Sequence, residues 1–204
     1  MNNKFISFEG IDGVGKTTQI ELFLKKLKKN NYDYSLFREP GGTPLSEKIR
    51  DSLLDNNNKI SNITETLLFL TARSDLVNKQ IKPSVDSGKK FIICDRFLDS
   101  TLAYQSFGRG ISLELIQSIT NAVVQDTIPS TTFLLDCSLE TCLSRLNKKD
   151  RMENSGSEFL FKVKKGFLEL ALLNKNRYVI IDANKSIIEI ENSIWEVFKE
   201  RYII

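Results

Sequence analysis

Short apolar runs alternate along the chain with stretches in which apolar residues recur every three or four positions. Ile20, Phe23, Leu24 and Leu27 show this helical spacing soon after the first apolar run. Strands that are apolar throughout and alternate with helices indicate a parallel sheet covered on both faces. We therefore expect an α/β protein, a three-layer α/β/α sandwich with a five-stranded parallel sheet. The predicted strands are residues 5–8, 33–37, 91–94, 132–135 and 178–181.

Local signals mark several helix boundaries. Thr43 followed by Pro44 is typical of a helix start, with Thr as the N-cap and Pro at the first helical position. Asn62 with Glu65 three residues later resembles a capping box and predicts a long helix to about Asp86. A C-terminal helix is indicated by Ile187, Ile190, Ile194, Val197 and Phe198.

The long predicted helix has two distinct faces. At 100° per residue, Phe69 and Arg73 lie one turn apart, away from the main apolar stripe. An aromatic ring that stacks on a base, with a guanidinium one turn on, would make a workable base site. The alternative is that Phe69 packs at the edge of the core and Arg73 is solvated. The core stripe is predicted to be Leu67, Leu70, Val77 and Ile81.

Composition limits the possible chemistry. The 204 residues contain no histidine, which excludes a Ser-His-Asp triad and every metal site with a His ligand. The length favours one domain over residues 1–204, since a domain has roughly 150 residues. A net charge of +3 suits small anionic ligands and shows no strong bias toward nucleic acid.

Three other features concern the cellular location, the cysteines and a loop. No signal peptide or membrane span is evident, and a cytoplasmic location is expected. The odd number of cysteines predicts buried, reduced thiols at Cys94, Cys137 and Cys142. Residues 147–157 lack apolar spacing apart from Met152 and predict a mobile loop between two helices.

The first predicted strand leads into a phosphate-binding motif. Residues 10–17, Gly-Ile-Asp-Gly-Val-Gly-Lys-Thr, match G-x-x-x-x-G-K-[ST]. In such a loop backbone N–H groups surround phosphate oxygens, Lys16 reaches the β- and γ-phosphates, and Thr17 offers its hydroxyl to Mg²⁺. The predicted nucleotide-binding residues are Gly10, Ile11, Asp12, Gly13, Val14, Gly15, Lys16 and Thr17.

The motif alone leaves three classes open: a GTPase switch, a motor or assembly ATPase, and a kinase of small molecules. Residues 147–150 fit N-K-x-D, which reads guanine in GTPases, but they follow a predicted helix, so we interpret the match as coincidental. Asp95 and Arg96 favour a kinase, since they follow the third strand at the edge where open α/β sheets bind ligands. Asp95 could hold Mg²⁺ and Arg96 could bridge two phosphates. Asp136 and Asp182 also end strands and could be metal partners or helix caps.

These motifs together resemble the thymidylate kinase family, the bacterial members in particular. The resemblance covers nearly the whole chain and implies the fold of P-loop nucleoside-monophosphate kinases. It rests on five features: FEGIDGVGKTTQ at 8–19, REPGGT at 38–43, Phe69 with Arg73, DRFLDSTLAYQ at 95–105 and Gly-Arg-Gly at 108–110. The first of these adds Thr18 to the implied ATP-binding residues.

The resemblance implies a role for each matching residue. Asp12 would contact the acceptor's 3′-hydroxyl, Phe69 would stack on thymine and Arg73 would bond to its edge. Tyr104 would disfavour a ribose, and the Glu39–Pro40 bond would be cis. The acceptor phosphate would be held by Arg50 and Arg96, with Arg38 nearby. The implied acceptor site also contains Glu39, Pro40, Ser100, Thr101 and Gln105.

Family members differ in where an ATP-side arginine comes from. Some carry it inside the phosphate loop, where this chain has Gly13, and others supply it from a lid. Residues 147–157 would then be the lid. Arg151 would contact the γ-phosphate, with Arg145, Lys148 or Lys149 in support.

The sequence thus predicts phosphoryl transfer from Mg-ATP to dTMP, giving ADP and dTDP. The predicted catalytic residues are Lys16, Asp95, Arg96 and Arg151, and the predicted Mg²⁺ ligands are Thr17 and Asp95. The alternatives are a deoxynucleoside kinase, which needs a carboxylate base near a 5′-hydroxyl, and a P-loop NTPase switch. The resemblance further implies a homodimer, and no nucleic-acid or membrane partner is expected.

Overall fold

The five predicted strands form one parallel sheet in the computed structural model, which describes residues 4–88, 90–145, 151–152 and 155–203. The strand order is β2-β3-β1-β4-β5. Each prediction was correct within two residues at either end. The strands are β1 (Phe5–Glu9), β2 (Tyr34–Arg38), β3 (Phe91–Asp95), β4 (Thr131–Asp136) and β5 (Tyr178–Asp182).

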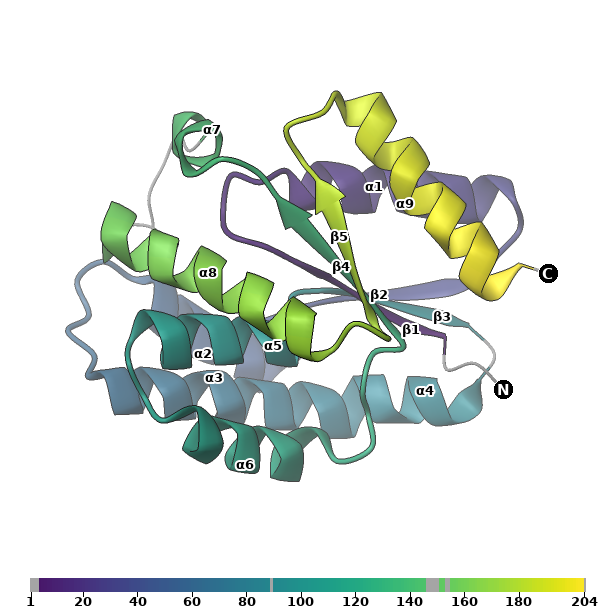
Figure 1. Ribbon diagram of the computed structural model, residues 1–204. Coiled ribbons are helices and arrows are strands. Elements are labelled where there is room, and N and C mark those ends of the chain that lie inside the picture. The colour runs from purple at the N-terminus through teal and green to yellow at the C-terminus, as the bar shows by residue number, and fades with distance from the viewer. Residues whose placement is uncertain (1–3, 89, 146–150, 153–154, 204) are drawn as a thin grey trace.

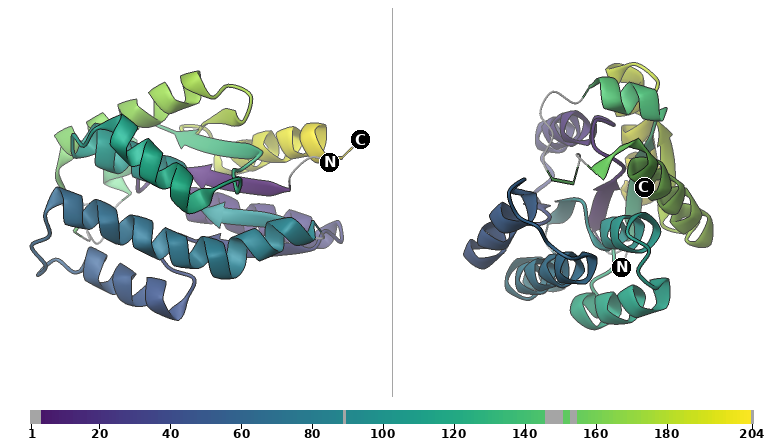
Figure 2. Two further views of the ribbon diagram at one scale, coloured as in Figure 1. Left: turned by 90° about the horizontal axis from the view of Figure 1, so that it is seen from below. Right: turned by 90° about the vertical axis from the view of Figure 1, so that its left-hand side faces the viewer.

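Helices cover both faces of this sheet and make the predicted three layers (Figure 1). Helices α1 (Lys16–Lys29) and α9 (Ile187–Tyr202) pack together on one face. The opposite side carries α3 (Asn62–Leu76), α6 (Leu113–Val124) and α8 (Ser157–Leu173), and Figure 2 shows the same layers from two further directions. The remaining elements are α2 (Pro44–Leu54), η1 (Val77–Ile81), α4 (Lys82–Ser87), α5 (Leu98–Thr101), η2 (Leu102–Gly108) and α7 (Leu139–Ser144).

The core lies between the sheet and its helices. Strand β1 is buried at all five positions, with strand neighbours on either side. On the α1 side, Phe23 packs edge-on against Phe198 with ring centroids 5.2 Å apart. Burying aromatic rings of this size removes a large apolar area from water and dominates core stability. In the part of the chain that the structure describes, no helix is long and apolar enough to cross a membrane.

The long helix ends within one residue of its prediction, at Ser87, but differs from the prediction in two respects. Its N-cap is Ser61, whose hydroxyl accepts from the Thr64 N–H, so the predicted capping box of Asn62 and Glu65 is wrong. The helix continues to Ser87 through the π-helical segment η1. Leu67 is 49% exposed and does not belong to the core stripe. The inward face of α3 instead carries polar groups, because part of it borders a cavity.

The predicted set of reduced thiols is also wrong. Cys94 is free and buried, but Cys137 and Cys142 are joined in a disulfide. They are five residues apart, at the end of β4 and in α7, and the turn between these elements brings their side chains together.

Candidate functional site

The phosphate-binding motif forms the loop between β1 and α1. Gly15 is the N-cap of α1 with φ 97°, and Gly13 has φ 80°, a left-handed conformation that glycine adopts without strain. Gly13 also lies against α7, since a Cβ built there would be 2.2 Å from the Cys142 carbonyl oxygen. The loop has no room for an arginine at this position. Its backbone N–H groups and the N-terminus of α1 form an anion site.

Lys16 lies over this loop and is nearly buried. Its Nζ donates to the carbonyl oxygens of Gly10 at 2.9 Å and Ile11 at 3.1 Å, and it lies 3.9 Å from Asp12 Oδ1. Burial, together with the positive charge of Arg96, lowers the pKa of Lys16 to about 8. A desolvated ammonium that has only carbonyls and one shared carboxylate as partners favours an incoming anion.

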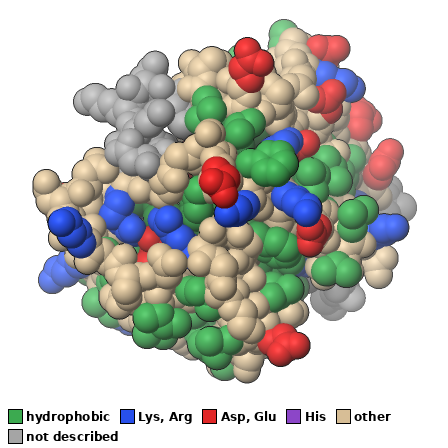
Figure 3. Space-filling view, turned by 60° about the vertical axis from the view of Figure 1, so that its left-hand side comes forward, with side chains coloured by type: hydrophobic (Ala, Val, Ile, Leu, Met, Phe, Trp, Pro, Cys, Tyr) green, Lys and Arg blue, Asp and Glu red, His purple; other side chains and the backbone are tan. Residues whose placement is uncertain are grey.

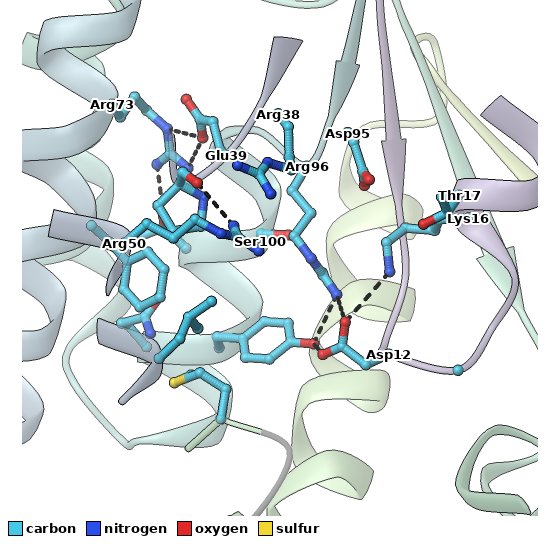
Figure 4. A pocket seen from close by; sticks show the side chains of 18 of the residues that line it. Asp12, Lys16, Thr17, Arg38, Glu39, Arg50, Arg73, Asp95, Arg96 and Ser100 are labelled. Atoms are coloured by element: carbon cyan, nitrogen blue, oxygen red, sulfur yellow. Dashed lines mark hydrogen bonds and ion pairs between the residues drawn. The ribbon is translucent and has the colours of Figure 1, made fainter. Parts of the chain in front are cut away.

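Arg96 connects the loop to the second half of the site. It has φ 65°, which is unusual outside glycine, and its NH2 donates to Asp12 Oδ1 at 2.5 Å. Its NH1 donates to the Gly10 carbonyl oxygen at 2.9 Å. Asp12 Oδ2 accepts from the Tyr104 hydroxyl at 3.0 Å. Although burial opposes ionisation, Arg96 and Lys16 hold the pKa of Asp12 well below its usual value. Figure 4 shows Arg96 and Asp12 paired beside Lys16.

Glu9 fixes the backbone of this turn, and sequence reasoning missed it. Its Oε1 accepts from the Phe97 N–H at 2.7 Å and its Oε2 accepts from the Ser100 hydroxyl at 2.6 Å. Burial, with the nearby Asp99, raises the pKa of Glu9 to about 8. A carboxyl group at the last position of a buried strand was the signal that could have identified it. Glu9 thereby holds the turn that carries Arg96 in its left-handed conformation.

Arg73 and Glu39 form a buried ion pair beside the same turn. Arg73 Nε and NH2 both donate to Glu39 Oε2, at 2.8 and 2.5 Å. The other contacts are NH1 to Thr101 Oγ1 at 2.7 Å and NH2 to the Phe97 carbonyl oxygen at 2.9 Å. The Glu39–Pro40 peptide is cis, as expected. Arg73 is therefore not solvated, and it fixes the geometry of the cavity wall.

One cavity of about 670 Å³ joins these groups. It extends from the phosphate loop to α2 and α3, at the carboxyl ends of the strands, where Figure 3 shows Lys and Arg side chains gathered. Arg38 pairs with Glu47 at 3.0 Å, and Arg50 donates to the Pro40 carbonyl oxygen at 2.9 Å. The cavity brings together the following predicted site residues: Asp12, Gly13, Gly15, Lys16, Thr17, Thr18, Arg38, Glu39, Pro40, Arg50, Phe69, Arg73, Asp95, Arg96, Ser100, Thr101, Tyr104, Gln105 and Arg145.

The residues near Thr17 suit a divalent cation held jointly with phosphates. Asp95 Oδ1 is buried and has no hydrogen-bond partner among the described residues. Thr17 lies exposed on the same cavity, as Figure 4 shows beside Lys16. No group of three or more acidic or cysteine ligands occurs in the described parts of the chain. One carboxylate and one hydroxyl match Mg²⁺ sites in which phosphates and water complete the coordination.

The predicted lid residues are in different places. Arg145 lines the cavity. Arg151 does not, because its Nε donates to the Leu53 carbonyl oxygen at 2.6 Å and its NH1 to Glu65 Oε2 at 2.6 Å. Lys148 and Lys149, and with them the N-K-x-D match, lie outside the described residues.

The two other strand-end carboxylates do not line the cavity. Asp136 is paired with Lys164, and Asp182 accepts from the Asn184 N–H at 3.0 Å in a local turn. Of the predicted nucleotide-binding residues, Gly10, Ile11 and Val14 support the loop from behind.

Comparison with known proteins gives one consistent family. The family model for thymidylate kinase matches residues 8–194. A thymidylate kinase from Thermoanaerobacter sp. (strain X514) is 39% identical over 202 residues, covering 98% of this chain and 99% of the relative. One from Symbiobacterium thermophilum is 41% identical over 199 residues, covering 96% of this chain and 92% of the relative.

Solved structures agree with the sequence relatives. The crystal structure of thymidylate kinase from Ehrlichia chaffeensis superposes with a TM-score of 0.80 at 36% identity, covering 98% of this chain and all of that one. The parallel sheet, the flanking helices and the phosphate loop therefore form the fold of P-loop nucleoside-monophosphate kinases. The chain belongs to the thymidylate kinase family.

Proposed function

We propose that this chain transfers the γ-phosphoryl group of Mg-ATP to dTMP, giving dTDP and ADP. The observation that carries this proposal is one continuous cavity, which joins a phosphate loop to a second set of arginines and to the ring of Phe69. The reacting nucleophile is a phosphate oxygen of the acceptor, so the protein must align two anions and neutralise their charge. Such an acceptor is mostly ionised at neutral pH, since the second pKa of a phosphate monoester is near 6, and needs no histidine base.

The donor half consists of the phosphate loop and its surroundings. Lys16 and the N-terminus of α1 would bind the β- and γ-phosphates, and Arg145 lies at the same cavity. Thr17 and Asp95 would hold Mg²⁺, which supplies charge neutralisation at the transferred group when bound. We retain Arg151 as a candidate γ-phosphate contact. Its present bonds to Glu65 and Leu53 would have to break first.

The acceptor half lies between α2, α3 and the turn after β3. Arg50 and Arg96 would hold the acceptor phosphate, with Arg38 nearby. Phe69 would stack on the base and Arg73 would contact its edge. Asp12, held by Arg96 and Tyr104, would accept from the 3′-hydroxyl. A cluster of three arginines favours an acceptor that already carries a phosphate, and this weighs against a deoxynucleoside kinase.

Assembly and location are part of the same proposal. We expect a homodimer, supported by Ile63 and Leu67 on α3 and Leu115 on α6, three half-exposed apolar side chains on helices that pack together. We also expect a cytoplasmic enzyme with no nucleic-acid or membrane partner. Sedimentation of the purified chain tests the dimer.

A coupled ADP-release assay tests the activity with thymidine, dTMP, dUMP and dCMP as acceptors. The proposal predicts turnover that depends on dTMP and negligible turnover with thymidine. Turnover with thymidine alone would identify a deoxynucleoside kinase. ADP release that no acceptor stimulates would identify an ATPase.

A further inference from the structure

Glu65 lies outside the cavity and is the most heavily bonded carboxylate behind its wall. It is 1% exposed, yet it accepts from Gln105 Nε2 at 3.1 Å, Arg109 Nε at 3.0 Å and Arg151 NH1 at 2.6 Å. Arg109 NH2 also donates to Oε2 at 3.2 Å. These partners come from η2, from the residue that follows it and from residue 151. None of the roles assigned above uses this carboxylate.

The charge state of Glu65 is set by its neighbours. Burial alone would raise the pKa of Glu65, but the hydrogen bonds and charge of Arg109, with the bond from Arg151, lower it below the usual value. Glu65 is therefore ionised at neutral pH and can only accept hydrogen bonds. The neighbouring amide group of Gln105 must therefore turn its NH₂ toward Glu65.

That constraint fixes the amide of Gln105. Because Nε2 donates to Glu65, the carbonyl oxygen Oε1 must point away from Glu65, and no described residue donates to it. Gln105 lines the cavity and lies one turn beyond Thr101, which Arg73 bonds. It belongs to the π-helical segment η2, and such segments are frequent at functional sites. Gln105 Oε1 is therefore the hydrogen-bond acceptor that this side chain can offer to the cavity it lines.

An acceptor at this place distinguishes pyrimidines by chemistry. Thymine and uracil carry an N–H at ring position 3, whereas cytosine has a bare nitrogen there that can only accept. A fixed carbonyl oxygen accepts a hydrogen bond from N3–H of thymine or uracil, but it faces the lone pair of N3 in cytosine. Sites that leave a buried polar group unpaired reject the wrong ligand strongly.

We propose that Glu65 is a positioning residue for acceptor selection, holding the Gln105 amide so that its oxygen faces the base and favours pyrimidines with an N3–H. The proposal rests on the dTMP site of the proposed function and adds to it the residue that fixes one wall. A hydrogen bond to a charged group contributes a factor of roughly 10 to 100 to an equilibrium, and this sets the expected effect.

Glu65→Gln is the sharpest perturbation, since it keeps the shape of the side chain. The single remaining carbonyl oxygen is drawn to Arg109 and Arg151, which leaves the new NH₂ beside Gln105. That NH₂ donates to the Gln105 oxygen and turns the amide over. The ratio of kcat/KM for dTMP to that for 5-methyl-dCMP should fall roughly 10- to 100-fold. The dTMP to dUMP ratio should stay within about twofold, because both bases carry N3–H.

Arg109→Met is the matched control. It removes an ion pair of Glu65 but leaves the bond to Gln105, so the dTMP to 5-methyl-dCMP ratio should stay within about twofold of wild type. If E65Q does not fold, E65Q/R109M compared with R109M measures the same effect with one fewer unpaired arginine.

The outcomes separate the two proposals. A wild-type enzyme that does not turn over dTMP overturns the acceptor assignment, and this inference with it. A wild-type enzyme that uses dTMP but does not prefer it to 5-methyl-dCMP overturns this inference alone. A wild-type preference that E65Q retains, or that R109M loses equally, overturns only the role of Glu65. A fall in that ratio confined to the variants lacking Glu65, with the dUMP ratio constant, supports the proposal.

Discussion

Replacing Arg73 with Met should destabilise the fold as well as harm acceptor binding. Arg73 and Glu39 are 3% and 4% exposed, and two of the four Arg73 hydrogen bonds go to Glu39. Arg73→Met leaves the carboxyl group buried without its partner. Breaking a buried pair on one side costs about 3–5 kcal/mol. For a chain of this length that corresponds to a melting temperature lower by roughly 6–20 °C.

The cost should depend on pH in a defined direction. Burial already raises the pKa of Glu39 against the opposing effect of Arg73, and losing Arg73 raises it further. The folded state then keeps a proton that the unfolded state has lost above about pH 4.5. Wild type shares this loss until the pH passes its own raised Glu39 pKa, so the deficit of the variant relative to wild type should grow as pH rises above that pKa.

Urea denaturation of wild type, R73M, E39Q and R73M/E39Q checks this reasoning. The double variant has no buried charge at this position and should be more stable than the sum of the single losses predicts. Additive losses, or a loss below about 1 kcal/mol in R73M, would refute the interpretation as a desolvated pair. Kinetics add a second readout, since R73M should raise KM for dTMP far more than KM for ATP.

Three further perturbations concern the phosphate loop and its support. Lys16→Met should lower kcat/KM by orders of magnitude, while circular dichroism shows an intact fold. In wild type, KM for ATP should rise above about pH 8, because Lys16 then loses its proton. In wild type, the free energy of unfolding measured by denaturation should fall by at most about 1.4 kcal/mol per pH unit between pH 4.5 and 8, because only the folded state keeps the Glu9 proton there. Glu9→Gln should remove this fall. Gly13→Ala should weaken ATP binding and lower the melting temperature, since its Cβ would clash with Cys142.

The strands and the phosphate loop were predictable because their signals are local. An apolar run of four residues and a glycine motif need no knowledge of distant parts of the chain. The same holds for the N-cap at Thr43, whose hydroxyl accepts from Ser46 N–H.

Glu65 and Leu67 show where local reasoning failed. The three-residue spacing of Asn62 and Glu65 matches a cap, yet the partners of Glu65 are Gln105, Arg109 and Arg151, which lie 40, 44 and 86 residues away. Apolar periodicity placed Leu67 in the core, but the inward face of this helix carries polar groups for the cavity. Only the fold brings these distant groups together.

The supports of Arg96 were out of reach for the same reason. Its partners Gly10 and Asp12 lie 86 and 84 residues away in the sequence and become neighbours because β3 pairs with β1. The disulfide between Cys137 and Cys142 likewise depends on the turn between β4 and α7. Residue type suggested which groups could act, and topology decided which of them meet.

The most direct test of the central claim follows the label from γ-labelled ATP in the wild-type enzyme. With dTMP as acceptor, label should appear in the terminal phosphate of dTDP in an amount equal to the ADP formed. Thymidine should acquire none. Label released as inorganic phosphate regardless of acceptor, or transferred to the 5′-hydroxyl of thymidine, would contradict the assignment of this cavity to dTMP phosphorylation.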